Sequence, residues 1–125
     1  TRPGGRIVIL DMVGSEDSER RVLHDRIERW CDPSHAGALP VSRFHRMFAE
    51  RCLAVRYSRK GERSEPLVDW LDHGGPPPGD LARILAEARR LRGENLGGLR
   101  FDEDGDALVV THTGMTWVVE KPAAD

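Results

Sequence analysis

Two acidic segments, near opposite ends of the chain, hold the carboxylates best placed for chemistry. Asp11 follows the apolar run Ile7–Leu10 and precedes the turn Gly14-Ser15, while Asp106 lies in a later Asp-Gly-Asp turn. A carboxylate at the end of a strand, next to the start of a helix, suits a metal or phosphate site. If the later hairpin lies beside the first strand, Asp11 and Asp106 would share a divalent cation through oxygen ligands. The alternative is that Asp11 only caps locally or pairs with an arginine.

The same two segments resemble the metal-binding elements of the class III nucleotide cyclase domain. The matching residues are Asp11-Met12-Val13-Gly14-Ser15 and Gly105-Asp106-Ala107. The resemblance implies a ferredoxin-like fold, dimerisation, and Mg²⁺ or Mn²⁺ held by the two aspartates for cyclisation of a nucleoside triphosphate. Glu16 stands where the family usually has threonine, and few residues follow Asp106. The resemblance therefore implies an incomplete, non-catalytic relative, and no other cofactor is expected.

Cysteine and histidine residues offer weaker alternatives. A zinc site would need four nitrogen or sulfur ligands, and one set with irregular spacing is Cys31, His35, His45 and Cys52. Both cysteines fall on predicted apolar helix faces, which favours core packing over metal binding. His24 is expected at the surface, and His112 is expected either to pack against a neighbouring strand or to take part in catalysis.

Charge is nearly balanced overall but unevenly distributed. Nineteen basic and 21 acidic residues give a net charge of -2, so the whole surface does not favour a polyanion. Between residues 43 and 63, however, seven basic residues stand against two acidic ones. Phosphate contacts to a nucleic acid could come from Arg43, Arg46, Arg56, Arg59 and Lys60. The alternative is a solvated or partner-docking face, because several of these charges have helical i, i+3 and i+4 spacing.

Hydrophobic periodicity indicates one strand, then four helices, then three strands. The first strand is expected over 6–13 and the first helix over 16–31, with Ser15 as its cap. A second helix opens at Ser42 and carries its apolar face through Val55, and residues 58–63 form a basic turn. Two further helices are expected after Ser64 and Asp80. This order predicts an α+β fold with helices packed on a mixed four-stranded sheet.

The last three strands are expected to form an antiparallel meander over 99–101, 107–112 and 115–120, with turns at Asp104-Gly105 and Thr113-Gly114. The final strand is expected at an edge of the sheet. Met115, Trp117 and Val119 share one of its faces by period two, so an exposed face there would bind a partner protein.

These observations favour a single α+β domain over residues 1–125, with a disordered or tag-like segment 1–5, a proline-glycine spacer 73–79 and a tail 121–125. With no strong catalytic motif, the function predicted first is a non-enzymatic regulatory module of a larger bacterial signalling or defence-type protein. It would act in the cytoplasm by binding another protein or by self-association, with no membrane partner. The cyclase-like metal site and the nucleic-acid surface are the alternatives.

Overall fold

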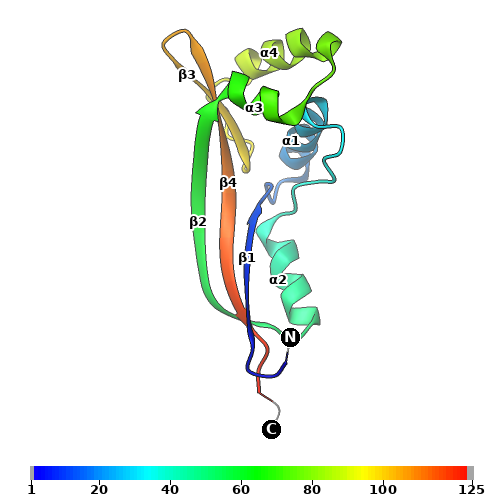
Figure 1. Ribbon diagram of the computed structural model, residues 1–125, viewed down its shortest axis with the longest axis vertical. Helices are drawn as coiled ribbons and strands as arrows, with labels where there is room; N and C mark the ends of the chain where they lie inside the picture. Colours follow the sequence, from blue (N-terminus) through cyan, green and yellow to red (C-terminus); the bar gives the residue numbers. More distant parts are fainter. Residues whose placement is uncertain (1, 124–125) are drawn as a thin grey trace.

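The structure is a computed structural model and describes residues 2–123 (Figure 1). The described chain contains four α-helices and a sheet of four strands paired antiparallel, so the fold is α+β. The first half contains β1 (Arg6–Met12), α1 (Ser18–Cys31), α2 (Val41–Glu50) and β2 (Ala54–Pro66). The second half contains α3 (Leu67–Gly74), a short 3₁₀ turn (Pro78–Asp80), α4 (Leu81–Arg90), β3 (Leu99–Asp104) and β4 (Ala107–Glu120).

All sheet pairing is organised around β4. Strand β2 pairs antiparallel with nearly the whole length of β4, from Ala54 opposite Glu120 to Pro66 opposite Val109. The other side of β4 is shared by β1 along one half and β3 along the other. Because β1 and β2 are both antiparallel to β4, they run in the same direction and their carboxyl ends face the same end of the sheet.

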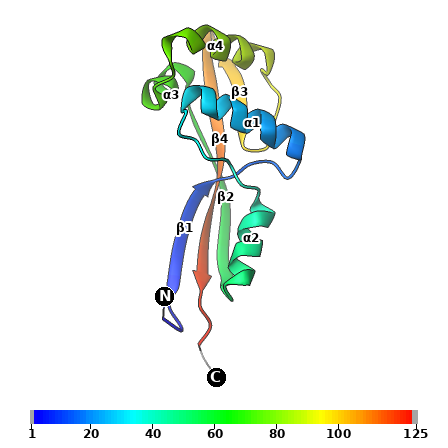
Figure 2. The same cartoon turned by 90° about the vertical axis from the view of Figure 1, so that its right-hand side faces the viewer.

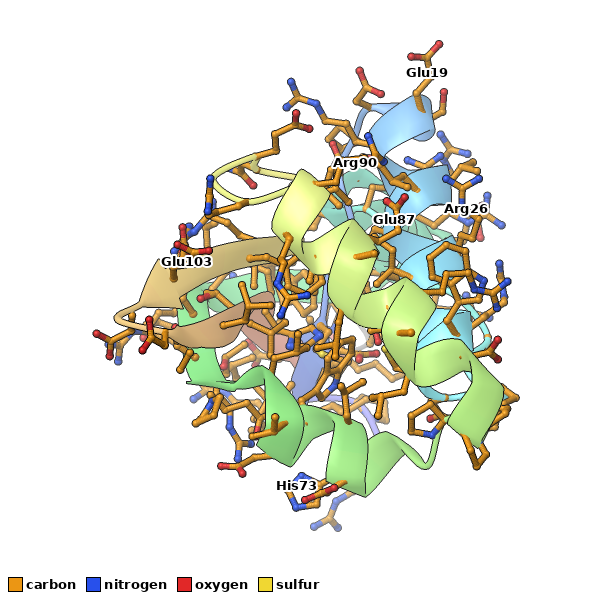
Figure 3. All side chains as sticks on the ribbon, turned by 90° about the horizontal axis from the view of Figure 1, so that it is seen from above. Glu19, Arg26, His73, Glu87, Arg90 and Glu103 are labelled. Atoms are coloured by element: carbon orange, nitrogen blue, oxygen red, sulfur yellow. The ribbon has the colours of Figure 1, made fainter. Side chains whose placement is uncertain are left out.

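The helices cover the sheet in two separate layers. Figures 1 and 2 show α1, α3 and α4 gathered at one end of the long sheet and α2 alone beside the other end. The first layer encloses a core that includes Ile27, Leu67, Ile84 and Phe101. The second core lies under α2, where Phe44 and Phe48 pack around Trp117. Seen from above, the outer surface of the layer formed by α1, α3 and α4 is charged, with Arg26 and Arg90 exposed to solvent and Glu87 half-buried (Figure 3).

The end of β1 and the start of α1 show how local sequence positions the later site. Along β1, Ile7 and Ile9 face the α2 core while Val8 and Leu10 point away from it, as strand alternation requires. The Asp17 carboxylate caps α1 by accepting hydrogen bonds from the N–H groups of Glu19 and Arg20. The predicted cap, Ser15, instead accepts a hydrogen bond from the N–H of Asp17. From this start, spacing of three and four residues buries His24, Ile27, Glu28 and Cys31 on one face.

Two predictions about the middle and end of the chain are wrong. The second helix stops at Glu50, and the expected basic turn over residues 58–63 lies inside the thirteen-residue strand β2. Thr113-Gly114 is not a turn, because β4 runs straight through it with partners on β1 and β2. Both segments are polar or glycine-containing, yet pairing along a shared central strand satisfies their backbone groups.

The described parts of the predicted end segments and spacer form backbone hydrogen bonds or belong to a helix. The N–H of Gly4 donates to the carbonyl of Lys121, and the N–H of Lys121 donates to Gly5. Helix α3 extends through residues 73 and 74 of the predicted spacer. Residue 1 and residues 124–125 of the predicted end segments lie outside the described residues. Within residues 2–123, no helix combines the length and apolar character needed to cross a membrane.

Candidate functional site

A buried carboxylate held by two histidines is the most unusual polar cluster in the described chain. Glu28 Oε1 lies 3.1 Å from Nε2 of His24, one helical turn away, and 2.8 Å from Nε2 of His112 on β4. All three side chains are buried. A buried ionised carboxylate is strongly unfavourable unless hydrogen bonds compensate its lost hydration, and here two imidazole N–H groups do so.

The electrostatics of this cluster keep Glu28 ionised. Burial alone would raise the pKa of Glu28, but the hydrogen bonds from His112 and His24, together with their charge, outweigh burial and lower it to about 2. Burial has the opposite outcome at Cys31, one turn further along α1. There it combines with the negative charge of Glu28 and Asp32 to raise the thiol pKa to about 12. Cys31 is therefore an inert core thiol.

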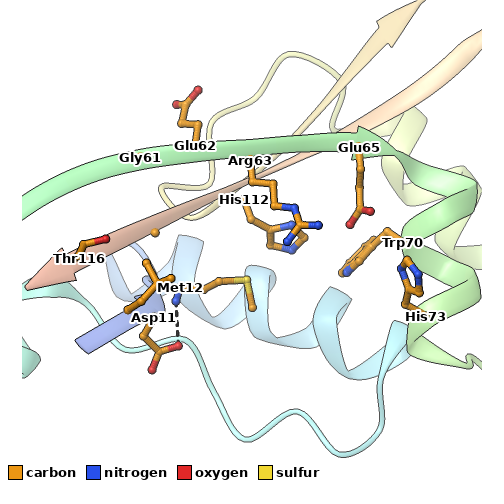
Figure 4. Close-up of a pocket in the computed structure, with 12 residues that line it drawn as sticks. Asp11, Met12, Gly61, Glu62, Arg63, Glu65, Trp70, His73, His112 and Thr116 are labelled. Carbon is orange, nitrogen blue, oxygen red and sulfur yellow. Dashed lines mark hydrogen bonds between the residues drawn. The ribbon is translucent and has the colours of Figure 1, made fainter. Parts of the chain in front are cut away.

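A cavity of about 590 Å³ opens beside His112, between the end of β1 and the second half of β2 (Figure 4). Its walls come from four elements. They contribute Leu10, Asp11 and Met12 of β1, Gly61, Glu62, Arg63 and Glu65 of β2, Trp70 and His73 of α3, and His112, Gly114 and Thr116 of β4. Apolar and aromatic walls with a few convergent polar groups are typical of ligand sites.

The sheet register explains why the cavity exists. Gly114 of β4 stands opposite both Gly61 of β2 and Met12 of β1, so two of the three residues in this row have no side chain. Two positions further along, Arg63 stands directly opposite His112. The indole of Trp70 meets the His112 ring edge to face, with centroids 5.0 Å apart. The cavity therefore has a floor of glycine backbone, with the Trp70 indole and the His112 imidazole at its sides.

The predicted pair of metal ligands does not come together. Asp11 stands opposite Met115 of β4, whereas Asp106 lies in the turn that precedes Ala107. Eight steps of extended chain from Ala107 to Met115 separate them by roughly 25 Å. The Asp11 carboxylate instead accepts a hydrogen bond from the N–H of Met12. Among residues 2–123, no cluster of three or more histidine, cysteine or acidic side chains is arranged to hold a metal ion.

The predicted partner-binding strand is a core strand. Trp117 and Val119 are completely buried and Met115 nearly so, because β4 lies between β1 and β2 and α2 covers this face. The indole N–H of Trp117 also donates to Nε2 of His45, 3.1 Å away. The expected exposed edge is therefore wrong: the strand is last in sequence but central in the sheet.

The predicted basic contacts are divided between two elements. Arg43 and Arg46 lie on α2, and Arg56, Arg59 and Lys60 lie on β2. All five are exposed, and Arg56 is paired with Glu120 at 2.6 Å.

Sequence reasoning missed Glu28 and misplaced His24, which is buried rather than at the surface. A signal was present, because His24 and Glu28 have the i, i+4 spacing of neighbours on one helix face. Trp70 and His73 were also not identified as site residues. Only the packing of α1 and α3 against β4 brings these side chains to His112.

Comparisons with known proteins identify the fold. No protein-family model and no curated protein matches the sequence. Two solved structures are similar over almost the whole chain. A candidate methyltransferase from Bacillus halodurans C-125 matches 97% of this chain with a TM-score of 0.83 and 18% identity. The YcgJ protein of Bacillus subtilis matches 98% with a TM-score of 0.84 and 18% identity.

These matches correct the two functional expectations drawn from the sequence. The chain spans about half the length of each structure, since 53% of either one is covered. The expected similarity to a nucleotide cyclase domain is wrong, because the fold matches the structure of a candidate methyltransferase instead. The expected non-enzymatic regulatory module, with its cyclase-like and nucleic-acid alternatives, is corrected by the same match. At 18% identity the matches show the fold alone, which is that of about half of each neighbouring structure.

Proposed function

We propose that this chain forms the acceptor-binding part of a methyltransferase-type enzyme. The fold of that part takes the place of the ferredoxin-like fold expected from the sequence. The observation that carries the proposal is the cavity beside His112. It lies between the end of β1 and the second half of β2, within a fold that matches a candidate methyltransferase over 97% of the chain. A concave site with apolar walls and convergent polar groups is the usual setting for a small ligand.

The outer side of β1 supports the view that more protein packs against this chain in the active enzyme. Within residues 2–123, β1 pairs only with β4. On the face away from α2, Val8 is 69% exposed, Leu10 76% and Met12 42%. An unpaired edge next to exposed apolar side chains is a surface that proteins normally cover.

The methyl donor of such enzymes, S-adenosylmethionine, does not fit the described residues. A nucleoside is commonly held where a strand turns through glycines into a helix, with the backbone close to the ligand. In the turn from β1 to α1, Gly14 faces the chain itself: a Cβ there would lie 2.5 Å from the carbonyl oxygen of Ala38. The absence of a side chain at Gly14 therefore serves internal packing. We place the donor site outside the described residues.

The cavity favours a small, flat acceptor. The glycine floor lets a ring lie close to the backbone, and Trp70 and Met12 supply apolar contacts at its sides. Arg63 projects into the same space (Figure 4). A planar molecule with one polar substituent would satisfy both kinds of wall.

The test is transfer of a labelled methyl group from S-adenosylmethionine to a panel of small phenols and amines. It uses the natural polypeptide that contains this chain. The informative variant is Gly61→Phe, which fills the cavity: a Cβ at Gly61 meets nothing within 4 Å, and phenylalanine favours strands. Gly79→Phe is the control, because Gly79 is equally open and does not line the cavity.

We expect label transfer by the wild type and by Gly79→Phe, and at least a tenfold loss in Gly61→Phe. In the 125-residue chain, the Trp70 indole N–H signal should shift on acceptor binding while that of Trp117 stays in place. Equal transfer by Gly61→Phe and the wild type would show that the acceptor binds elsewhere. Absence of transfer to every acceptor would refute the methyltransferase assignment.

A further inference from the structure

We infer that His112 is the general base that removes a proton from the acceptor, and that Glu28 is its positioning residue. This inference rests on the function proposed above and specifies its acceptor as a hydroxylated planar ring. It is carried by three features: the shared hydrogen bonds of Glu28, the different surroundings of the two imidazoles, and an arginine without an acidic partner.

The hydrogen bonds determine which nitrogen of His112 is available. The Glu28 carboxylate is ionised and only accepts, so Nε2 of His112, 2.8 Å away, must carry its hydrogen. In the neutral ring, Nδ1 then holds a lone pair. Nδ1 of His112 makes no hydrogen bond to another described residue, yet it is not among the atoms sealed from solvent, and the ring lines the cavity. A lone pair that faces a ligand cavity, with a carboxylate behind the ring, is the arrangement of a general base.

His24 has the same contact to Glu28 but the opposite surroundings. Its Nδ1 is fully buried and has no hydrogen-bond partner among the described residues. A second proton on His24 would therefore be a buried donor without an acceptor, which is strongly unfavourable. A proton taken from a ligand in the cavity is therefore accepted by His112, where Glu28 stabilises the positive charge. The two histidines therefore have different roles: His24 helps to hold the carboxylate in place, and His112 exchanges the proton.

Charged groups around His112 indicate the kind of acceptor. Arg63, directly opposite on β2, extends toward the His112 ring (Figure 4) and forms no ion pair within residues 2–123. Glu65 of β2, His73 of α3 and Asp11 of β1 line the remaining walls. An unpaired guanidinium next to a base stabilises an oxygen that becomes negative as it loses its proton. With Trp70 as a wall, a phenol-type hydroxyl fits best.

Methylation of the acceptor oxygen would use a sulfonium co-substrate bound outside the described residues, and its sulfur would keep the electron pair of the broken carbon–sulfur bond. The O–H bond of the acceptor breaks, its electron pair stays on oxygen, and the proton passes to Nδ1 of His112. The Glu28 carboxylate stabilises the imidazolium, which then releases the proton to water.

Nitrogen-15 NMR of the histidine rings in the 125-residue chain tests the geometry without any enzymatic activity. We expect His24 and His112 both to carry hydrogen on Nε2, and a bound phenol to shift Nδ1 of His112 only. Glu28→Gln should weaken both hydrogen bonds and shift both Nε2–H signals. An Nδ1–H tautomer at His112, or a phenol that shifts neither ring, would overturn the inference.

Methyl transfer tests the chemistry in the natural polypeptide. We expect His112→Gln to lower kcat by about 10²-fold or more with little change in KM. The loss should be much smaller with a nitrophenol, which ionises without a base. Glu28→Gln should give a smaller loss and a shifted pH profile. His35→Gln is the control, since His35 also contacts a carboxylate, Asp25 at 3.0 Å, but does not line the cavity.

An equal loss for phenol and nitrophenol in His112→Gln would overturn the base and leave the methyltransferase assignment intact. Absence of transfer by the wild type would overturn both.

Discussion

Replacing Glu28 with glutamine keeps the size of the side chain but removes the negative charge of the carboxylate that accepts hydrogen bonds from two buried imidazoles. Both imidazole N–H groups donate to Oε1 of Glu28, so a glutamine oxygen in that place can still accept from both rings, but as a neutral group it makes weaker hydrogen bonds. The pKa of Glu28 gives the magnitude. A decrease from 4.5 to about 2 corresponds to about 3 kcal/mol of folding stability.

The sign of the pH dependence follows from the direction of this shift. Because the folded state lowers the pKa, the Glu28 contribution is complete above pH 4.5 and is lost as the pH falls toward 2. At pH 7, Glu28→Gln should reduce the free energy of unfolding by about 3 kcal/mol. At pH 3, most of the wild-type contribution has gone, and the difference should shrink to about 1 kcal/mol.

Urea unfolding followed by tryptophan fluorescence at both pH values measures this difference. Glu50→Gln is the matched control: Glu50 is exposed at the end of α2, and its substitution should change stability by less than about 0.5 kcal/mol. A Glu28→Gln variant as stable as the wild type at pH 7 would refute the reasoning. A destabilisation equal at pH 7 and pH 3 would show that Glu28 acts through packing and not through its charge.

Two further predictions concern residues outside this cluster. In the native protein a thiol reagent should modify the exposed Cys52 and spare the buried Cys31, whose pKa is raised to about 12, whereas both should react in urea; rapid native modification of Cys31 would contradict its place in the core. Gly98→Ala should lower the urea midpoint clearly, because the added Cβ would overlap the carbonyl of Val13, while Gly79→Ala should leave it almost unchanged. Equal midpoints for the two variants would mean that the backbone around Gly98 can move apart.

The sequence predicted those parts of the fold that depend on local pattern. The first helix and the apolar faces of α3 and α4 agree with their periodicity, since one buried face is enough to define each of them. The first strand has nearly the expected bounds, but apolar residues on both of its faces favour a buried central strand, whereas β1 lies at an edge with Val8 and Leu10 exposed. The pattern failed at Val55, which continues the apolar stripe of α2. There the chain leaves the helix at Cys52, in a left-handed conformation, and enters β2. Whether such a segment is helix or strand depends on whether a partner strand is available.

The sequence alone therefore determined an α+β domain, the position of β1 and the acidic and basic segments along the chain. Only the tertiary structure decided which of these residues share a site. It placed Asp11 and Asp106 far apart, because the hairpin turn lies at the opposite end of β4 from the β1 contact. It also brought Glu28 from α1 to His112 of β4, which lies 84 positions later in the chain. Distance along the sequence says little about such contacts, because strand pairing and helix packing join segments by shape and burial rather than by chain order.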